Sequence, residues 1–337
     1  MLLNQNCEVY VAAEGQCRLL LEKEYKNIVF LDVPGYQIHY SRKKAGMTLK
    51  LLTQVPKIIY SIYRENSQLK KIVRSYSIDA VITDNRLGMY HSVTPSVYIT
   101  HQLKIKTGFR FTEWVAQKIH YWFINKYSEC WVPDAIGVPN LAGELSHPTT
   151  LPDVRVQYMG PLSRFEKTTV EIKYDLAIIV SGPEPQRTVF EEMILKDIKN
   201  YHGKVLLIRG LPDGSSELKN TFSQLIIKNH LPAAELNLAI QESGLIISRC
   251  GYTTVMDLVK LQKRAILIPT PGQTEQEYLA GYLGKQKIFL CIQQQFFYLP
   301  EVVKEAEGFS FNKTAFPQNE YENVVKNFLK KYGLFEG

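Results

Sequence analysis

The sequence predicts an α/β protein built from two Rossmann-like domains that face each other across a cleft. The chain has 337 residues, which fits two domains of roughly 150 residues each better than one ordinary core. Short apolar runs rich in β-branched residues alternate with helical patterns along its whole length. Such alternation is typical of parallel sheets built from βαβ units. We therefore expect one doubly wound sheet in each half.

Apolar runs predict the strands of each half. In the first half the runs are EVYVAA, NIVFLD, DAVITD, SVYIT and ECWVPD, and in the second they are YDLAIIVSG, KVLLIRG, LIISRCG, RAILIP and KIFLCI. Residues 140–171 are rich in Pro, Gly, Ser and Thr and contain MGPLSR, so the domain junction is placed there. The predicted domains are 1–160 and 161–337. A last helical pattern over 319–332 is long enough to cross a domain boundary, and no residue in it indicates where it docks.

The beginning of the chain departs from the pattern of a doubly wound domain. Such a domain begins with a strand and a turn, whereas residues 1–6 resemble the end of a helix that leads directly into EVYVAA. We therefore expect the first strand and the following glycine loop of the first domain to be missing. Two explanations stay open: a start assigned too far downstream, and a real loss in a partner subunit.

The composition is that of a globular protein, with 45% apolar and 22% charged residues. Its five cysteines are scattered and show no C-x-x-C spacing, which favours neither a disulfide framework nor a zinc site and fits a reducing, cytoplasmic setting. No apolar run reaches the roughly 18 residues that spanning a bilayer needs. We therefore expect a cytoplasmic protein that neither spans the membrane nor is secreted.

Positive charge is concentrated in the first domain. The net charge is +7, and residues 1–160 hold 19 Lys/Arg against 13 Asp/Glu, while the other residues hold 21 against 20. Residues 42–74 carry nine basic residues and one acidic residue among apolar residues at near-helical spacing. Residues 103–127 combine five Lys/Arg with Trp114 and Trp122. Two interpretations stay open: peripheral contact with an anionic membrane, at the inner face of the plasma membrane, or ordinary helices with solvated basic faces.

The strongest signal lies in 244–283, where strand, glycine turn, helix, strand and proline loop follow one another. The residues GLIISRCGYTTVMDLVKLQKRAILIPTPGQTEQEYLAGYL resemble the C-terminal domain of MurG-like glycosyltransferases, whose pattern runs S-R-S-G, T-x-x-E on a helix, a strand, a proline loop and Q-x-x-N-A. The resemblance is specific over about 170–300. It implies the two-domain GT-B fold and a nucleotide diphosphate sugar, with uracil as the base.

The turn at Ser248, Arg249 and Gly251 suits a diphosphate. It presents backbone N–H groups at a helix N-terminus, where the helix dipole favours negative charge, and Gly251 lets a ligand come close. The resemblance implies that Asp257, where the family has Glu, accepts hydrogen bonds from the ribose. Thr253 and Thr254 belong to the same predicted site. An alternative for Thr254 and Asp257 is a T-x-x-D capping box that only starts the helix.

The proline loop that follows the predicted strand RAILIP is also expected to face the donor. Gln273, Glu275 and Gln276 in the proline loop are placed to bond the donor sugar, although a solvated helix start would also explain them. Where the family pattern has Asn-Ala, this sequence has Leu279 and Ala280, so the donor sugar is not identified.

A second anion cradle is predicted after the strand YDLAIIV, where a glycine loop leads into a helix. Its candidate residues are Ser181, Gly182 and Arg187, and Arg187 is either a diphosphate partner or a surface arginine at a helix start. Arg209 ends the next strand, where the ligand crevice of an open α/β sheet lies, and is either a ligand contact or one half of an ion pair.

The first domain should supply the acceptor site and a base that deprotonates the acceptor hydroxyl. Asp84 in ITDNRLG and His101 in YITHQ lie just beyond strand ends and are the catalytic candidates. A turn or N-cap role for Asp84 and a hydrogen-bonded loop role for His101 are the alternatives. No D-x-D sequence occurs, so a metal-chelated diphosphate is not predicted, and helix dipoles and arginine are expected to stabilise the leaving group.

The sequence therefore predicts a metal-independent glycosyltransferase without a resident cofactor. Its partners are a nucleotide sugar as co-substrate and a hydroxyl acceptor, for which a glycan or a lipid-linked molecule is expected. Nucleic acid is disfavoured because no helix-turn-helix, zinc knuckle or RNP-like pattern occurs. Two alternatives stay open: a nucleotide-sugar 2-epimerase, and an inactive subunit that binds nucleotide or membrane.

Overall fold

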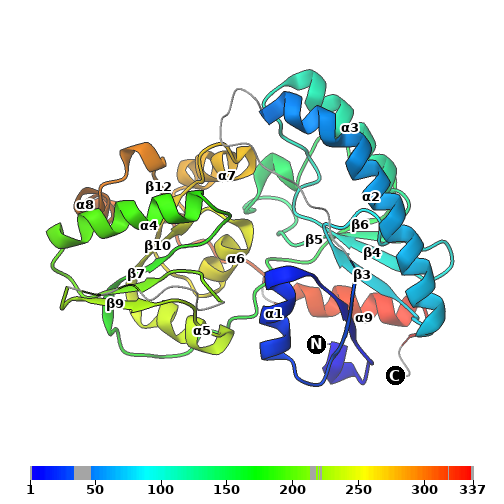
Figure 1. Ribbon diagram of the computed structural model, residues 1–337, viewed down its shortest axis with the longest axis horizontal. Coiled ribbons are helices and arrows are strands. Elements are labelled where there is room, and N and C mark those ends of the chain that lie inside the picture. The colour runs from blue at the N-terminus through cyan, green and yellow to red at the C-terminus, as the bar shows by residue number, and fades with distance from the viewer. Residues whose placement is uncertain are drawn as a thin grey trace. The chain divides into compact units, whose positions relative to one another are not determined.

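The computed structural model describes residues 2–33, 47–212, 218, 220, 222–317 and 319–334 (Figure 1). The chain divides into two compact units, of which the first comprises Met1–Gly160 with Pro317–Gly337 and the second comprises Pro161–Phe316. Every strand pairing in both units is parallel, as the alternating pattern of the sequence predicts. Each unit is therefore an α/β domain with its own sheets.

The described residues of the first unit form two parallel sheets. The smaller pairs β1 (Tyr10–Ala12) with β2 (Val29–Leu31). The larger keeps chain order, with β3 (Val81–Asp84), β4 (Ser96–Ile99), β5 (Glu129–Val132) and β6 (Val156–Tyr158). β5 is buried along its whole length, as expected of a strand covered on both faces. Because β3 and β4 pair in parallel, their carboxyl ends lie side by side.

Helices surround the sheets of the first unit. In chain order they are η1 (Leu2–Gln5), α1 (Gly15–Glu24), α2 (Met47–Ser75), α3 (Arg110–Ile124), η3 (Gly143–Leu145) and α9 (Glu320–Lys331). Of the predicted basic stretch 42–74, residues 42–46 lie outside the described residues, and the rest falls within α2. No helix in the described part of the chain is long and apolar enough to cross a membrane.

In the second unit, the strands that the structure describes form a six-stranded sheet with the order β12-β11-β10-β7-β8-β9. Its strands are β7 (Tyr174–Ile179), β8 (Val205–Ile208), β9 (Leu225–Lys228), β10 (Ser243–Arg249), β11 (Ala265–Ile268) and β12 (Leu290–Cys291). Numbered within the unit, this is the order 3-2-1-4-5-6 of the Rossmann fold. The order reverses between β7 and β10, and the carboxyl ends of these two strands mark the topological switch point.

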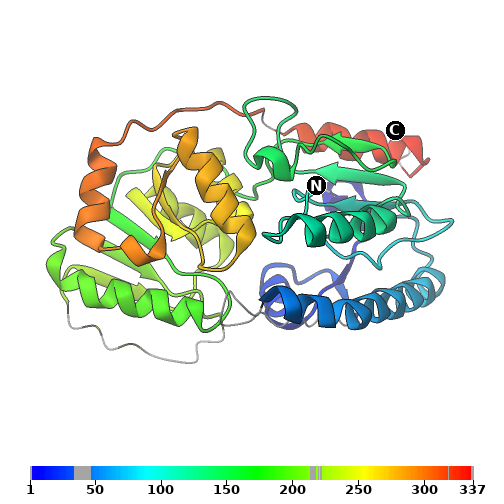
Figure 2. The same cartoon turned by 90° about the horizontal axis from the view of Figure 1, so that it is seen from above.

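The helices of the second unit cover both faces of this sheet (Figure 2). They are α4 (Gln186–Asp197), η4 (Ile198–Asn200), α5 (Ala233–Gln241), α6 (Tyr252–Lys260), α7 (Thr274–Lys285), η5 (Gln294–Phe296) and α8 (Leu299–Gly308). Leu176, Ile178 and Ile247 of the central strands pack with Phe190 of α4 and Val302 of α8 in one buried core. This core fixes the loops that follow β7 and β10.

Helix α9 lies with the first unit, whereas the predicted domain 161–337 placed it with the second. Phe328 of α9 packs edge-on against Trp131 of β5, with ring centroids 5.3 Å apart, and both side chains are buried. Lys331 adds an ion pair to the buried Glu129, with the Nζ to Oε1 distance at 2.7 Å. The chain thus returns to the first unit after 316 because α9 completes the core around β5.

Candidate functional site

The switch point of the second unit brings two predicted loops together. β7 and β10 are hydrogen-bonded neighbours, with Ile178 opposite Ile247 and Ile179 opposite Ser248. Residues 180–185 follow β7, and Cys250 and Gly251 follow β10, so both loops leave the same edge of the sheet. Ligands of open α/β sheets bind in the crevice at this edge. The two segments predicted separately from the sequence therefore lie at the same edge of the sheet.

The start of α6 leaves its backbone accessible. Gly251 is the N-cap, and as a glycine it has no side chain that could cover the N–H groups of the first turn. A Cβ added at Gly251 would meet nothing within 4 Å among the described residues, so a ligand can approach the first turn closely. Thr253 is exposed and Thr254 is partly buried, and both lie in that turn. An N-terminus of this kind attracts anions through its N–H groups and dipole.

The capping-box interpretation of Thr254 and Asp257 is wrong. Thr254 is the third residue of α6 and does not precede the helix, because the helix already begins at Tyr252. Asp257 instead accepts a hydrogen bond from the hydroxyl of Ser163 at 2.6 Å. Burial raises the pKa of the Asp257 carboxyl to about 6, although the hydrogen bond from Ser163 and the charge of Arg164 act in the opposite direction.

Arg249 lies under this turn and is 1% exposed. Its Nη1 donates to Oε1 of Gln294 at 2.7 Å, its Nη2 donates to the carbonyl of Gln186 at 2.8 Å, and its guanidinium carbon lies 4.3 Å from the ring centroid of Phe190. Nε is buried with no hydrogen-bond partner among the described residues, and burial lowers the pKa of Arg249 to about 10. Arg249 thus brings a buried positive charge to the switch point and joins the segments that begin α4 and η5.

Ser248 is buried beside Arg249 at the end of β10. Its hydroxyl donates to the carbonyl of Arg249 at 3.2 Å. Ser248 therefore bonds the backbone of the turn itself.

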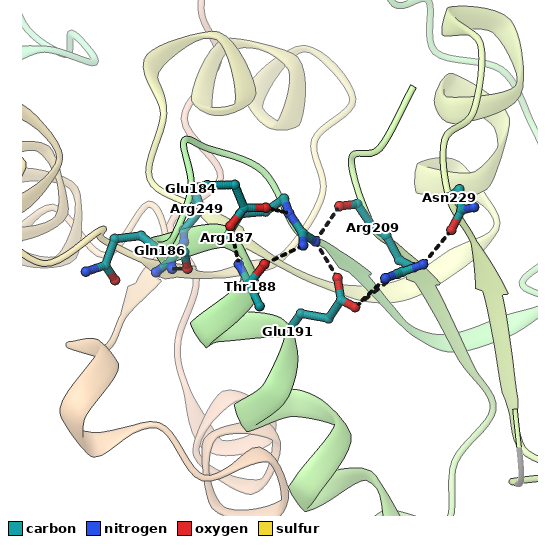
Figure 3. A network of polar contacts seen from close by, with 8 residues as sticks. All are labelled: Glu184, Gln186, Arg187, Thr188, Glu191, Arg209, Asn229 and Arg249. Carbon is teal, nitrogen blue, oxygen red and sulfur yellow. Dashed lines mark hydrogen bonds and ion pairs between the residues drawn. The ribbon is translucent and has the colours of Figure 1, made fainter. Parts of the chain in front are cut away.

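The loop after β7 is held by a network of ionised side chains (Figure 3). Arg187 is 6% exposed, so the alternative of a surface arginine is wrong. Its Nε lies 2.5 Å from Glu184, its Nη1 forms an ion pair with Glu191, and the same Nη1 donates to the carbonyl of Arg209 at 3.2 Å. The Arg187 guanidinium thus connects the loop after β7 with the carboxyl end of β8.

Arg209 meets the same carboxylate from the opposite side. Its Nε and Nη2 donate to Oε1 of Glu191 at 3.0 and 2.8 Å, and its Nη1 donates to Oδ1 of Asn229 at 2.8 Å. Of the two interpretations for Arg209, the ion pair is present in this structure. Figure 3 shows Glu191 on α4 between the two guanidinium groups. Both arginines are thus fixed by protein groups at the switch point.

Ser181 and Gly182 precede this network in the loop. Gly182 has φ +108°, a conformation that residues with a Cβ rarely adopt, and a Cβ built there would meet nothing within 4 Å among the described residues. The position of Gly182 is therefore compatible with a ligand that approaches the backbone of the loop.

The proline loop after β11 is organised by its own glutamines. Oε1 of Gln276 accepts from the N–H of Thr270 at 2.9 Å, and Nε2 of Gln276 donates to Oε1 of Gln273 at 2.6 Å. Gln273 is the N-cap of α7, and Glu275 lies in the first turn of that helix. The amide of Gln276 therefore shapes the loop.

The first unit brings Asp84 and His101 together. β3 and β4 are neighbours with Asp84 opposite Ile99, so Asp84 ends one strand and His101 follows the other at the same edge of the sheet. Surrounding protein raises the pKa of the Asp84 carboxyl by desolvation, and the charge of His101 offsets part of this rise. The pair can serve as an acid–base couple for a hydroxyl substrate.

Sequence reasoning missed Glu191, Ser163, Gln294 and Asn229. For Glu191 a signal existed, since Arg187 and Glu191 are four residues apart in one predicted helix and such pairs meet on one helix face. Ser163 lies in MGPLSR, which was used only to place the domain junction. Gln294 and Asn229 lie 45 and 20 residues from the arginines they contact, and no spacing rule connects them.

The segment that holds these residues of the second unit is similar to known proteins. Residues 188–331 match the family described as the glycosyltransferase family 28 C-terminal domain. The chain is 28% identical over 127 residues to the UDP-N-acetylglucosamine--N-acetylmuramyl-(pentapeptide) pyrophosphoryl-undecaprenol N-acetylglucosamine transferase of Rickettsia rickettsii (strain Sheila Smith). That match covers 35% of this chain and 34% of the relative, so the chain matches about a third of the length of this curated relative.

Solved structures share the fold over nearly the whole chain. Spinosyn rhamnosyltransferase SpnG complexed with thymidine diphosphate superposes with a TM-score of 0.62 at 14% identity, covering 97% of this chain and 93% of that one. MurG of Acinetobacter baumannii gives 0.50 at 16% identity, covering 96% and 87%. These likenesses establish the fold. The chain therefore has the two-domain GT-B fold, and its residues 188–331 match the glycosyltransferase family 28 C-terminal domain.

Proposed function

We propose that the chain is a glycosyltransferase that moves a sugar from a nucleotide diphosphate sugar, linked to uridine, to a hydroxyl acceptor. The observation that carries the proposal is the uncapped start of α6 at the switch point, in the segment that matches a glycosyltransferase domain. The diphosphate would lie against the open backbone at Gly251, where the helix dipole and the positive charge of Arg249 stabilise it as it leaves.

Asp257 is proposed to bind the ribose of the donor. Its carboxyl group lies further along α6 than the diphosphate position, and it is partly buried. Burial raises the pKa of the Asp257 carboxyl to about 6. A ribose hydroxyl that donates to the carboxylate would stabilise its ionised form and so lower this pKa. The curated relative is named for a UDP-linked donor, which supports uridine as the nucleoside.

The first unit is proposed to receive the acceptor. Asp84, with its raised pKa and with His101 beside it, would accept the proton of the attacking hydroxyl. The curated relative transfers its sugar to an undecaprenol-linked molecule by its name, which supports a lipid-linked acceptor here.

A lipid-linked acceptor requires an enzyme at a membrane, and the first unit offers a suitable surface. Phe111 and Trp114 of α3 stack with centroids 6.5 Å apart while 74% and 60% exposed, and Phe109 and Trp122 are also exposed. Lys104, Lys106, Arg110, Lys118 and Lys126 lie on or next to this helix. Exposed aromatic rings among basic residues suit an anionic lipid surface. We therefore propose peripheral binding at the cytoplasmic face of the plasma membrane.

Thermal unfolding with UDP, TDP, GDP, ADP and CMP tests the donor site. A ligand specific for the folded state, at a hundredfold excess over its dissociation constant, adds about 2.7 kcal/mol to the stability. We expect the largest rise of the unfolding temperature with UDP, and a smaller rise in Asp257→Asn. Glu235→Gln, an exposed change on α5, is the matched control and should respond like the unaltered chain. If none of the five nucleotides raises the unfolding temperature, the proposal is overturned.

A further inference from the structure

A cavity of about 320 Å³ lies at the amino edge of the six-stranded sheet in the second unit. Arg264 directly precedes β11, and Ile288 and Phe289 directly precede β12, and all three residues line the cavity. Because these strands run parallel to β10, the loops of the proposed donor site leave the sheet at its opposite edge. Every lining residue falls within Pro161–Phe316. The cavity is therefore distinct from the proposed donor site and belongs to the second unit.

Apolar side chains form much of the lining. Four of these residues are buried, and they are Leu258, Val259, Ile288 and Phe289. Phe309 and Phe311 add a half-buried pair of rings, with centroids 4.8 Å apart and ring planes at 69°. Aromatic rings attract a further ring in edge-on or offset arrangements, beyond the effect of the area that is buried. The lining therefore suits an aromatic occupant.

The segment that carries these two rings is held by hydrogen bonds. The backbone N–H of Asn312 donates to the carbonyl of Lys287 at 2.8 Å, and Nδ2 of Asn312 donates to the carbonyl of Gln286 at 2.7 Å. Phe309 and Phe311 also pack against the buried core of the unit. The cavity is thus formed before any ligand binds, which lowers the entropic cost of binding.

Positive charge accompanies the apolar lining. Lys263, Arg264 and Lys313 line the cavity, and its lining contains no acidic residue. None of the three forms an ion pair with a carboxylate in the part of the chain that the structure describes. Nζ of Lys263 donates to the carbonyls of Gln241 and Ser243, each at 2.7 Å. Burial lowers the pKa of Lys263, and the charge of Arg264 acts in the same direction. An anion at the cavity would offset this repulsion.

We propose that this cavity binds a small aromatic molecule that carries one carboxylate or phosphate group. The apolar lining would bury the rings, and the exposed side chains of Arg264 and Lys313 would bind the anionic group through charge-assisted hydrogen bonds. The volume is roughly twice that of an engineered cavity that binds benzene, which suits a body of about two rings. A neutral molecule would leave the cations without a counter-ion, and an alkyl chain would gain no ring packing. The proposal does not depend on the proposed function.

Calorimetric titration of the full chain with 2-naphthoate tests the site. 2-Naphthamide is the neutral control of the same shape, and octanoate is the anionic control without rings. We expect the amide to bind about tenfold more weakly or less, because a hydrogen bond to a charged group contributes at least that much. Octanoate should also bind more weakly than 2-naphthoate. Equal binding of 2-naphthoate and its amide, equal or tighter binding of octanoate, or no binding of 2-naphthoate would overturn the proposal. A parallel titration with 2-naphthyl phosphate identifies the preferred acidic group, and either preference supports the proposal.

A matched pair of double variants tests the role of the cations. Arg264→Gln combined with Lys313→Gln should weaken 2-naphthoate binding about tenfold and leave binding of the amide unchanged. Lys196→Gln combined with Lys199→Gln removes two exposed cations elsewhere in the second unit and should preserve 2-naphthoate binding. Equal losses in the two double variants would show attraction to the net charge alone and would contradict the proposal.

A thiol introduced at the cavity locates the bound molecule. Ala315 is exposed and lines the cavity, so Ala315→Cys provides a thiol there. With 2-naphthoate at ten times its dissociation constant, this thiol should react with a maleimide about tenfold more slowly. Cys17, exposed in the first unit, is the internal reference. Unchanged reactivity of the introduced thiol, or displacement of 2-naphthoate by UDP, would place the molecule elsewhere and overturn the proposal.

Discussion

The hydroxyl of Ser163 donates a 2.6 Å hydrogen bond to the carboxylate of Asp257, and this bond ties the start of the second unit to the helix at the proposed nucleotide site. Neither residue is fully exposed, and the carboxyl group is desolvated enough to titrate near neutrality, at a pKa of about 6. A substitution of Ser163 should therefore change the pKa of Asp257, although the two residues are 94 positions apart in the sequence.

Asp257→Asn should change how stability depends on pH. The pKa of Asp257 is raised from its ordinary value of 3.8 to about 6 in the folded chain, so the folded state holds the proton more tightly. The stabilisation from this group is then complete below pH 4 and is lost as the pH rises through 6. Relative to the original chain, Asp257→Asn should gain roughly 2 to 3 kcal/mol between pH 4 and pH 7. Urea unfolding at both pH values measures the difference.

Ser163→Ala supplies the control for this titration. Removing a hydrogen bond that favours the ionised carboxylate should raise the pKa of Asp257 further and steepen the loss of stability toward pH 7. In Asp257→Asn the same Ser163 change should leave the pH profile unaltered. A steeper profile in that double variant would show that another group titrates.

Glu191→Gln should destabilise the second unit strongly. The carboxylate of Glu191 is shared by Arg187 and Arg209, and all three side chains are less than one tenth exposed. Glutamine keeps the size but removes the charge, which leaves two buried cations without this counter-ion. Breaking a buried ion pair from one side costs about 3 to 5 kcal/mol.

The neighbouring Glu192 provides a matched control on the same helix. Its side chain is exposed, so Glu192→Gln should change the free energy of unfolding by about 0.5 kcal/mol or less. Guanidinium unfolding, followed by a probe in the second unit, compares the two variants. Equal stability of Glu191→Gln and Glu192→Gln would mean that the network contributes little.

The sequence predicts much of the fold because the signals are local. The apolar runs of β7, β8, β10 and β11 are four to seven residues long and are bounded by glycine or proline, so both the strands and their carboxyl ends could be identified. Arg249 and Gly251 could be placed at a strand end for the same reason. The positions of loops at an edge of a parallel sheet follow from the order of elements.

Side-chain partners could not be predicted in the same way. Whether Arg187 faces solvent or Glu191 depends on how α4 packs against β8, and the sequence of the loop alone does not determine that packing. The docking of α9 depends on the fit of Phe328 against Trp131, two residues 197 positions apart. The predicted second domain, 161–337, therefore includes α9, which packs with the first unit.

Phe328→Ala should detach α9 and destabilise the first unit. The side chain is 1% exposed and contacts Trp131, which is equally buried, so truncation leaves a cavity in a packed core. Phe to Ala changes in cores cost about 3 to 5 kcal/mol. Asn327→Ala, an exposed change on the same helix, should cost about 0.5 kcal/mol or less. A double-mutant cycle with Trp131→Ala should give a coupling of about 0.5 to 1.5 kcal/mol.

Asp84→Asn should separate catalysis from donor binding. If Asp84 accepts the proton of the attacking hydroxyl, its loss should lower kcat by about a hundredfold to ten-thousandfold, because a positioned base contributes that much. The UDP-induced rise of the unfolding temperature should stay unchanged, since the donor residues lie in the other unit. Release of UDP from a UDP-sugar in the presence of acceptor measures kcat. Asp79→Asn, in the turn before β3, is the matched control at the opposite end of the same strand. An unchanged kcat in Asp84→Asn would move the role of the base to another group, with His101 as the next residue to replace.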